Sequence, residues 1–174
     1  PAEDLLVTFS RYIYTHNVQG KIKVLRNTIE MIEDRYDYIF MDCAPNLGDL
    51  TLNALAYANY FISPVQLGGF CLTALDRFMN FAEEARAEGH TQAEPLGIVF
   101  TMKDRSRIER EIGASIREKY GSTVFTTEIK KRAKIKEFSL TGTQMAKRDE
   151  VDALQDYLDL TEEVIERINS RERA

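Results

Sequence analysis

Apolar and polar positions follow one another along the chain in blocks that predict strands and helices in turn. Four short apolar runs predict strands at residues 38–41, 60–66, 96–102 and 122–129. Around them, apolar residues recur every three or four positions, which predicts amphipathic helices at residues 20–36, 51–59, 74–89, 108–120 and 150–169. A shorter helix before them would carry Leu5, Phe9 and Ile13. Such alternation is typical of a mostly parallel sheet flanked by helices, so we expect a single α/β domain over residues 1–174.

Some expectations concern single elements. The last helix should turn six apolar residues toward the sheet: Val151, Leu154, Leu158, Val164, Ile165 and Ile168. The charged residues 169–174 are expected to fray, and residues 130–149 are predicted to form a basic loop. Thr73 and Asp76 resemble a capping box that would open the helix at 74–89.

Composition indicates an ordinary globular protein. Of the 174 residues, 44% are hydrophobic and 29% are charged, so neither disorder nor a fibrous class is indicated. No apolar run approaches the roughly 18 residues that a membrane span needs, and the first residues lack the pattern of a signal peptide. Cys43 and Cys71, the only cysteines, give neither a disulfide framework nor zinc-ligand spacing. A cytoplasmic protein that does not bind membranes is therefore expected.

The charge is unevenly distributed. The chain has a formal net charge of −5, yet the stretch from Lys103 to Lys136 holds 11 basic and 5 acidic residues. Such a basic stretch in an acidic chain is typical of a surface that binds a polyanion. It is also compatible with an ordinary solvated face, and charge alone favours that second interpretation.

Asp42 ends the first apolar run and precedes a turn-like stretch with Pro45 and Gly48. In open parallel sheets, ligands bind beyond the carboxyl ends of the strands. An acid there can hold Mg²⁺ in a nucleotide-hydrolysing P-loop protein, or accept phosphate in a receiver-like domain, where Thr101 would be the candidate hydroxyl. Receivers also need a second acidic cluster, and none lies near a strand end before Asp42. A simple helix or turn cap is the third possibility.

Four sequence blocks carry a more specific resemblance. YDYIFMDCAPNLGDLTLNAL, from Tyr36, resembles the Walker B and switch II segment of the ParA/Soj partition ATPases. Three blocks that resemble later family segments follow in the same order: SPVQLGGFCLTALDRF, LGIVFTMKDRSR and TVFTTEIKKRAKIKEFSLTG. The resemblance implies a P-loop NTPase fold of the Rossmann-like type, and it implies ATP and Mg²⁺ as cofactors.

The resemblance also implies roles for individual residues. Asp42 would be the catalytic Walker B acid and would hold Mg²⁺ through a water molecule, and Asn46 and Gly48 would belong to the switch that senses the γ-phosphate. Seven residues would lie near the nucleotide base: Thr101, Met102, Lys103, Asp104, Ile129, Lys130 and Lys131. Six residues would contact DNA phosphates: Arg105, Arg107, Lys131, Arg132, Lys134 and Lys136.

The chain departs from the family pattern in two ways that matter. The family's phosphate loop, K-G-G-x-x-K-[ST], does not occur in the 174 residues, so the chain reads as the C-terminal portion of such an ATPase and is not expected to hydrolyse ATP alone. Lys130 stands where the family has a proline in its base-binding loop. An apolar surface left uncovered in such a portion would promote self-association.

In the complete protein, the resemblance implies ATP-dependent dimerisation, DNA binding without sequence preference, and a ParB-like centromere-binding partner at the nucleoid. The alternative is a DNA-binding or protein-docking module without ATPase activity. A receiver-like phosphoacceptor domain is the third hypothesis.

Overall fold

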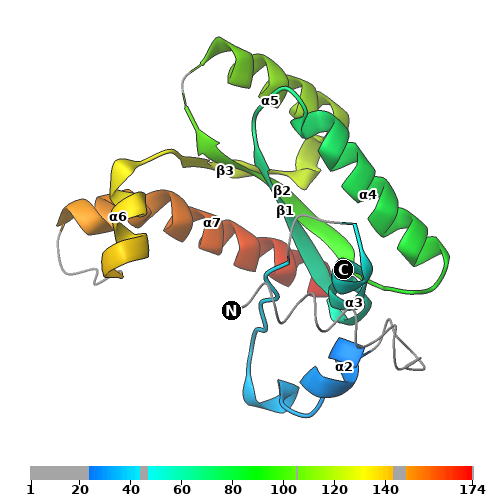
Figure 1. The fold of residues 1–174 in the computed structure, drawn as a ribbon. Coiled ribbons are helices and arrows are strands. Elements are labelled where there is room, and N and C mark those ends of the chain that lie inside the picture. The colour runs from blue at the N-terminus through cyan, green and yellow to red at the C-terminus, as the bar shows by residue number, and fades with distance from the viewer. Residues whose placement is uncertain (1–23, 44–46, 105, 143–147, 174) are drawn as a thin grey trace. The chain divides into compact units, whose positions relative to one another are not determined.

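The computed structural model describes residues 24–43, 47–104, 106–142 and 148–173 (Figure 1). The helix predicted around Leu5, Phe9 and Ile13 lies outside these residues. The described helices and strands follow in this order: α2 (Val24–Ile29), η2 (Glu33–Arg35), α3 (Asp49–Tyr57), β1 (Tyr60–Gln66), α4 (Cys71–Ala87), β2 (Glu94–Lys103), α5 (Arg107–Tyr120), η3 (Gly121–Thr123), β3 (Val124–Lys130), α6 (Ala133–Thr141) and α7 (Arg148–Glu172).

The strands form one sheet in the order β1-β2-β3, and β2 runs parallel to β3. Five consecutive residues of β2, from Leu96 to Phe100, are buried. Burial on both faces is typical of a parallel strand covered by helices on each side. Figure 1 shows α5 and α7 on opposite sides of β2 and β3. The α/β class and three of the four predicted strands are therefore confirmed.

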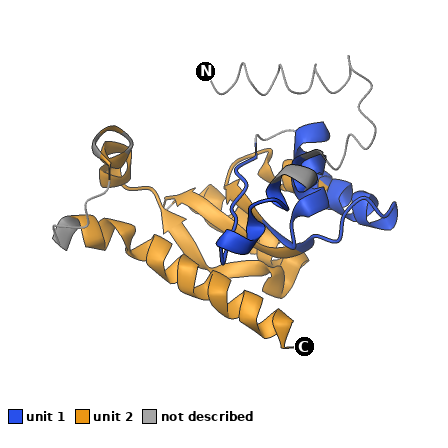
Figure 2. Ribbon diagram, turned by 90° about the horizontal axis from the view of Figure 1, so that it is seen from below, with its two compact units in different colours: residues 1–61, 77–94 blue, residues 62–76, 95–174 orange. Residues whose placement is uncertain are grey.

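The chain divides into two compact units, one of residues 1–61 and 77–94 and the other of residues 62–76 and 95–174 (Figure 2). In the first unit, Leu55 of α3 forms a core cluster with Ala82 of α4 and Ala93. The Thr91 hydroxyl donates to the Leu55 carbonyl and accepts from the Ala93 amide, so α3 and the entry to β2 are joined.

The second unit has its core between β2, β3 and the two helices that cover them. Ile98, Phe100 and Phe125 are almost fully buried there, as is Ile116 of α5. Gly97 of β2 faces the Phe125 ring: a Cβ at this glycine would lie 2.7 Å from Phe125 Cδ2 and 2.9 Å from Arg167 Nη1. Packing in the second unit therefore requires a glycine at position 97.

The strand predicted at residues 38–41 is wrong, because the structure describes this segment without strand pairing. Tyr38 is 53% exposed and Phe40 is 83% exposed. A strand needs a hydrogen-bonded neighbour, and the sheet of the described residues contains only β1, β2 and β3. Residues 38–41 are apolar, as a strand would be, but no strand in the described part of the chain pairs with them.

Two helical predictions also need correction. The helix predicted at 20–36 is described only as α2, followed by a turn and the short η2. The helix predicted from residue 74 begins earlier, at Cys71, so Thr73 lies inside it and is not a cap. Asp76 instead accepts a hydrogen bond from the Tyr120 hydroxyl, at 2.6 Å.

The predicted basic loop at residues 130–149 is wrong in its middle part, where α6 forms. Ile135 and Phe138 are half-buried and lie three positions apart, which is the spacing of one helical face. Lys134 pairs with Glu137 at 2.9 Å, again across one helical turn. The many lysines concealed this short amphipathic period in the sequence.

The inward face of α7 agrees only in part with the predicted apolar one. Leu154, Val164 and Ile168 are half-buried, whereas Val151, Leu158 and Ile165 are exposed. The buried positions are Ala153 and Asp156. Charged side chains can face the strand because the backbone and side chains of β3 satisfy their polar atoms. The helix also extends to Glu172, where the sequence predicted fraying, and Arg171 donates to the Pro95 carbonyl at 2.7 Å.

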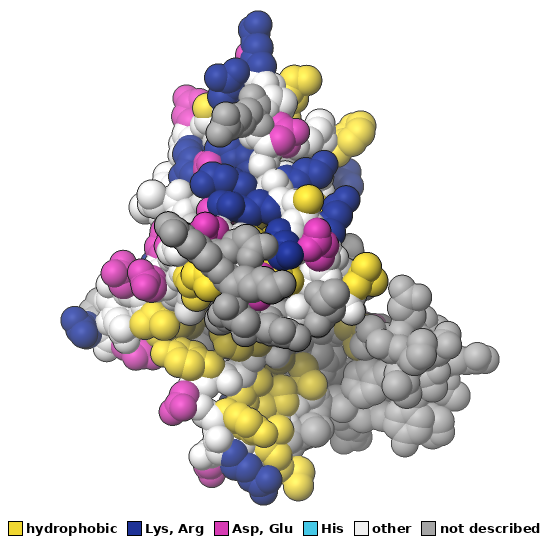
Figure 3. Space-filling model, turned by 90° about the vertical axis from the view of Figure 1, so that its left-hand side faces the viewer, with side chains coloured by type: hydrophobic (Ala, Val, Ile, Leu, Met, Phe, Trp, Pro, Cys, Tyr) yellow, Lys and Arg dark blue, Asp and Glu magenta, His cyan; other side chains and the backbone are white. Residues whose placement is uncertain are grey.

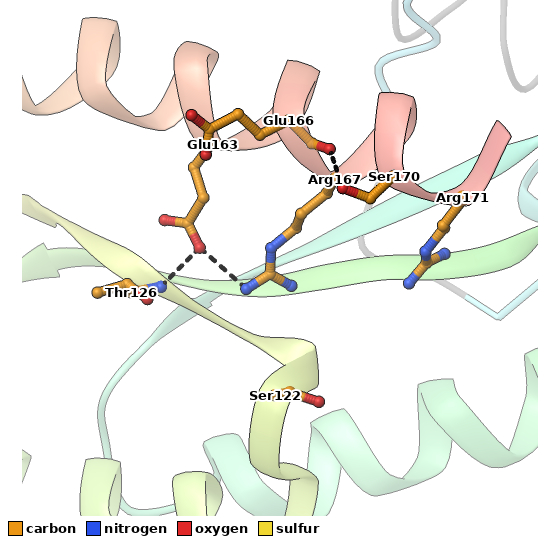
Figure 4. Close-up of a pocket in the computed structure, with 7 residues that line it drawn as sticks. All are labelled: Ser122, Thr126, Glu163, Glu166, Arg167, Ser170 and Arg171. Atoms are coloured by element: carbon orange, nitrogen blue, oxygen red, sulfur yellow. Dashed lines mark hydrogen bonds and ion pairs between the residues drawn. The ribbon is translucent and has the colours of Figure 1, made fainter. Parts of the chain in front are cut away.

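Glu163 and Arg167 anchor α7 to the strands and line an open depression of about 580 Å³ (Figure 4). The Glu163 carboxylate accepts from the Thr126 and Thr127 amides, both at 2.9 Å, and from Arg167 at 2.9 Å. Arg167 also donates to three strand-entry carbonyls and lies 4.0 Å above the Phe125 ring. This ion pair therefore helps to fasten α7 to the strands.

Glu163 is expected to make the fold sensitive to acid. Burial raises the pKa of its carboxyl, but the hydrogen bonds from Thr126, Thr127 and Arg167 outweigh that effect and hold the pKa below its usual value. A lowered pKa in the folded state stabilises the fold above the unfolded pKa of about 4.3, and this stabilisation is lost as pH falls through the folded pKa. Glu163→Gln should lower the free energy of unfolding by about 1–2 kcal/mol at pH 7.

Urea unfolding at pH 7 and at pH 3 tests this expectation. The difference between wild type and Glu163→Gln should shrink at pH 3, because the wild-type carboxyl is then partly protonated. Glu166→Gln, at an exposed position on the same helix, is the matched control and should change little at either pH. An equal loss for Glu163→Gln at both pH values would contradict the electrostatic interpretation.

Candidate functional site

The residues with predicted roles fall into both units of the chain. Asp42 and Gly48 belong to the first unit, whereas the residues predicted to bind the base and DNA belong to the second. Asn46 and Arg105 lie outside the described residues. Each part of the candidate site is therefore described within its own unit.

Asp42 lies in the extended segment before α3, and its side chain is exposed. Beside it, the Cys43 thiol contacts the Met41 carbonyl at 3.7 Å. Partial burial raises the pKa of the Cys43 thiol, and the neighbouring Asp42 carboxylate raises it further. Gly48 is the N-cap residue of α3 and has an extended backbone. Asp49 follows in the first turn, where its carboxylate interacts favourably with the helix dipole. An accessible carboxylate of this kind can accept hydrogen bonds from the water shell of Mg²⁺.

The carboxyl end of β2 has an irregular backbone. Met102 has a φ of 50°, in the left-handed region, and the ladder with β3 shifts register between Phe100 and Lys103. A left-handed conformation costs a residue with a side chain roughly 1–2 kcal/mol. The Met102 side chain is 53% exposed, so burial of this side chain does not explain the left-handed backbone. Strained backbone of this kind concentrates at ligand sites.

A hydrogen-bond network fixes the turn between β2 and α5. The Asp104 carboxylate accepts from the Ser106 amide at 2.6 Å, and the Asp104 amide donates to the buried Glu109 carboxylate at 2.7 Å. Ser106 caps α5 by accepting from the Glu109 amide at 3.2 Å. The backbone hydrogen bond from Ser106 holds the pKa of the Asp104 carboxyl below its usual value. Asp104 thus shapes this turn.

Lys103 is engaged in an ion-pair network between β2, β3 and α5. Its ammonium group pairs with Glu128, and Arg117 bonds the same carboxylate at 3.1 Å. Burial raises the pKa of the Glu128 carboxyl, but the two cations outweigh it and the net shift is downward. Arg117 also donates to the Phe125 carbonyl at 3.1 Å. The Lys103 side chain therefore fastens the strand ends.

The carboxyl end of β3 is fixed from both sides. The Lys131 amide donates to the Lys103 carbonyl at 3.0 Å, which joins it to β2. On the α7 side, the Asp156 carboxylate accepts from the Lys130 amide at 3.1 Å and from Arg132 at 3.2 Å. The structure thus brings the two predicted base-contacting stretches together, at neighbouring strand ends.

The six residues predicted to contact DNA differ in their exposure and in whether they form ion pairs within the chain. The Arg107 side chain is 84% exposed and pairs with Glu111, while Lys131 and Lys136 are exposed. Arg132 is held by Asp156. Figure 3 shows Lys and Arg side chains gathered on the face that carries α6 and the start of α5. This surface of the second unit, which includes the exposed Arg107, Lys131 and Lys136, is called the basic face.

Three acidic residues that organise these strand ends were not singled out from the sequence: Glu109, Glu128 and Asp156. Glu109 follows Ser106 by three positions, so the capping-box pattern could have revealed it. Asp156, Glu163 and Arg167 are spaced as one helical face, but polar residues at this spacing normally indicate an exposed face. No local signal identifies the partners of Glu128, because Lys103 lies 25 residues away.

Comparison with known proteins identifies the family of this chain. Residues 2–94 match a protein family described as "AAA domain". The chain is 31% identical over 155 residues to the chromosome-partitioning ATPase Soj of Treponema pallidum, an alignment that covers 88% of this chain and 61% of that protein. It is 30% identical over 152 residues to the chromosome partitioning protein ParA of Caulobacter vibrioides, with 85% and 57% covered. The chain belongs to the ParA/Soj family.

Solved structures support the same fold for this ParA/Soj family member. A plasmid partition protein from Borrelia burgdorferi superposes with a TM-score of 0.54 at 22% identity, over 70% of this chain and 51% of that one. A structure described as "Partition Protein" superposes with a TM-score of 0.61 at 22% identity, over 97% and 45%. The fold is that of the ParA-type P-loop NTPases. The chain spans about three fifths, 61%, of the Treponema Soj length.

Proposed function

We propose that this chain forms part of a ParA/Soj-type ATPase that acts in plasmid or chromosome partitioning. The observation that carries the proposal is the pair of strand ends in the second unit. There, a strained residue, Met102, and the Lys130–Arg132 turn lie next to each other at the carboxyl ends of parallel strands. Ligands of open α/β sheets bind at such strand ends.

The proposed cofactors are ATP and Mg²⁺. The Asp42 carboxylate is exposed and would accept from a water on Mg²⁺, and Gly48 would belong to the switch beside the γ-phosphate. Across residues 24–43, 47–104, 106–142 and 148–173, no three His, Cys, Asp or Glu side chains form a metal cluster. A single carboxylate suits a cation that keeps several of its waters, as Mg²⁺ does.

The proposed partners are non-specific DNA, a ParB-like centromere-binding protein and a second copy of the ATPase. Exposed Tyr36, Tyr38 and Phe40 in the first unit provide apolar surface for self-association. No helix within the described part of the chain is long and apolar enough to cross a membrane. A nucleoid-associated location in the cytoplasm follows from the proposed DNA binding.

The basic face is expected to bind DNA weakly and without sequence preference. Phosphate contacts release counterions, so affinity should fall steeply as salt rises, with a Kd of about 10⁻⁴–10⁻⁶ M at physiological salt. Replacing the three most exposed candidates, Arg107, Lys131 and Lys136, by alanine should weaken binding to all sequences alike. Each lost contact should reduce the slope of log K against log salt by about 1.

Fluorescence anisotropy with two unrelated duplexes over a series of salt concentrations measures both quantities. The matched control replaces three exposed arginines elsewhere by alanine: Arg26, Arg86 and Arg173. This control should keep the wild-type slope. Absence of wild-type binding at low salt, or an equal loss in both triple variants, would show that the basic face is only a solvated surface.

A further inference from the structure

Asp156 is a buried acid whose partners all belong to the turn that follows β3. It is 6% exposed, on the side of α7 that faces the strand. Its carboxylate accepts from the Lys130 amide at 3.1 Å, the Lys130 ammonium at 3.3 Å and Arg132 at 3.2 Å. Burying a carboxylate is costly unless charged and hydrogen-bonded partners compensate it. Here one backbone amide and two cations do so.

These contacts fix the turn at its two ends. The Lys130 amide is the last of β3, and Arg132 is the extended N-cap residue of α6. Between them, the Lys131 amide donates to the Lys103 carbonyl at 3.0 Å. The Lys130–Arg132 turn is therefore clamped between α7 and the end of β2, beside the left-handed Met102.

The clamp leaves one polar atom of the turn unsatisfied. Arg132 uses Nη2 to bond Asp156, at 3.2 and 3.4 Å, whereas its buried Nε has no hydrogen-bond partner among the described residues. Buried donors are normally paired, and an unpaired one is a feature of strained or functional sites. The unpaired Nε thus marks the Lys130–Arg132 turn as a candidate functional site.

We propose that Asp156 is a positioning residue, which holds the Lys130–Arg132 turn in the shape that receives the base of a bound purine nucleotide. The proposal rests on the nucleotide-binding role proposed above. Asp156 does not itself touch the nucleotide; it acts through the backbone of Lys130 and the guanidinium of Arg132. Loss of Asp156 should therefore weaken recognition of the base and spare recognition of the phosphates.

Glu163 supplies a matched control on the same helix and strand. Like Asp156, it accepts from backbone amides of β3 and from an arginine. Its amides belong to Thr126 and Thr127, within β3 rather than at its carboxyl end. If the carboxylates only fasten α7, Glu163→Gln and Asp156→Asn should have the same consequences for binding.

The test uses a chimera in which the phosphate-loop segment of the Treponema Soj relative precedes residues 1–174. Binding of ATP and of inorganic triphosphate is measured by calorimetry for wild type, Asp156→Ala, Asp156→Asn and Glu163→Gln, each checked by thermal melting. Asp156→Ala should weaken ATP binding about tenfold, the effect of losing preorganisation in the base loop, and leave triphosphate binding unchanged. Asp156→Asn keeps an acceptor for the Lys130 amide, so it should show a smaller loss. Glu163→Gln should bind both ligands as wild type does.

The outcomes separate this inference from the proposed function. If the wild-type chimera binds neither ligand, the proposed nucleotide function fails and the positioning role fails with it. If the wild type prefers ATP but the Asp156 variants bind like wild type, only the positioning role is wrong. It is also wrong if ATP and triphosphate weaken equally, or if Glu163→Gln shows the same selective loss. Should Asp156→Ala not fold, Asp156→Asn decides between these outcomes.

Discussion

Asp42→Ala is expected to remove most of the magnesium-dependent ATP hydrolysis of the chimera with a phosphate loop. The carboxylate is exposed before the proposed switch segment, where it would orient the water shell of Mg²⁺. A bound metal ion stabilises transition-state charge by several kcal/mol, so its misplacement should lower turnover by about 100-fold or more. Steady-state phosphate release at saturating ATP measures this loss.

Asp37→Ala is the matched control for this expectation, because Asp37 is also exposed and lies between η2 and α3, as Asp42 does. It should keep wild-type turnover. The 174 residues without an added phosphate loop should show no turnover above background, since they contain no K-G-G-x-x-K-[ST] sequence. Wild-type rates in Asp42→Ala would identify Asp42 as a cap of the turn. Magnesium-dependent turnover by the 174 residues alone, abolished in Asp42→Ala, would overturn the requirement for the loop.

Gly97→Ala should cause the largest loss of stability of any single methyl addition in the second unit. The new Cβ would lie 2.7 Å from Phe125 Cδ2 and 2.9 Å from Arg167 Nη1, closer than packed atoms approach. The Phe125 ring is buried and held under Arg167, so it has little room to move. Overpacking of this kind costs about 1–3 kcal/mol, and we expect the upper end, about 3 kcal/mol.

The matched control for this expectation is Gly113→Ala in α5. A Cβ there would meet Leu67 and Phe100 at 3.4 Å, an ordinary packing distance. Because alanine favours a helix by about 1 kcal/mol over glycine, this variant should keep or gain stability. Urea unfolding at pH 7 compares the two. A Gly97→Ala midpoint equal to that of wild type would show that Phe125 and Arg167 can move aside.

Local periodicity predicted most of the fold. The strand at 60–66 agrees with β1 in both bounds, and Leu75 of α4 and Ile116 of α5 are buried, although Ile108 at the start of α5 is exposed. Prediction failed where the deciding partner was distant in sequence. The run at 38–41 has the composition of a strand, but composition does not supply a neighbouring strand. In α7, apolar periodicity predicted the half-buried Leu154, Val164 and Ile168, but not the hydrogen bonds that Asp156 and Glu163 make to β3.

Prediction of the candidate site also failed where the interacting residues were distant in sequence. The family resemblance implied that Thr101–Asp104 and Ile129–Lys131 lie near one base, and the structure brings the two strand ends together. The sequence could not reveal that Lys103 and Arg132 are already ion-paired, because Glu128 and Asp156 lie 25 and 24 residues away from them. From sequence alone, a basic residue is assumed to be available for binding a ligand, because its acidic partners within the fold are not known.

The carboxylates of α7 also bear on how the chain behaves while it is being made. Among the described strands, β3 is at the edge of the sheet, and its Thr126, Thr127 and Lys130 amides find their acceptors on α7. Unpaired amides on an edge strand are a template for pairing with another chain. A ribosome releases β3 before α7, so the nascent chain carries an open edge until Glu163 has emerged. Once α7 has packed on β3, these three amides are no longer available to pair with another chain.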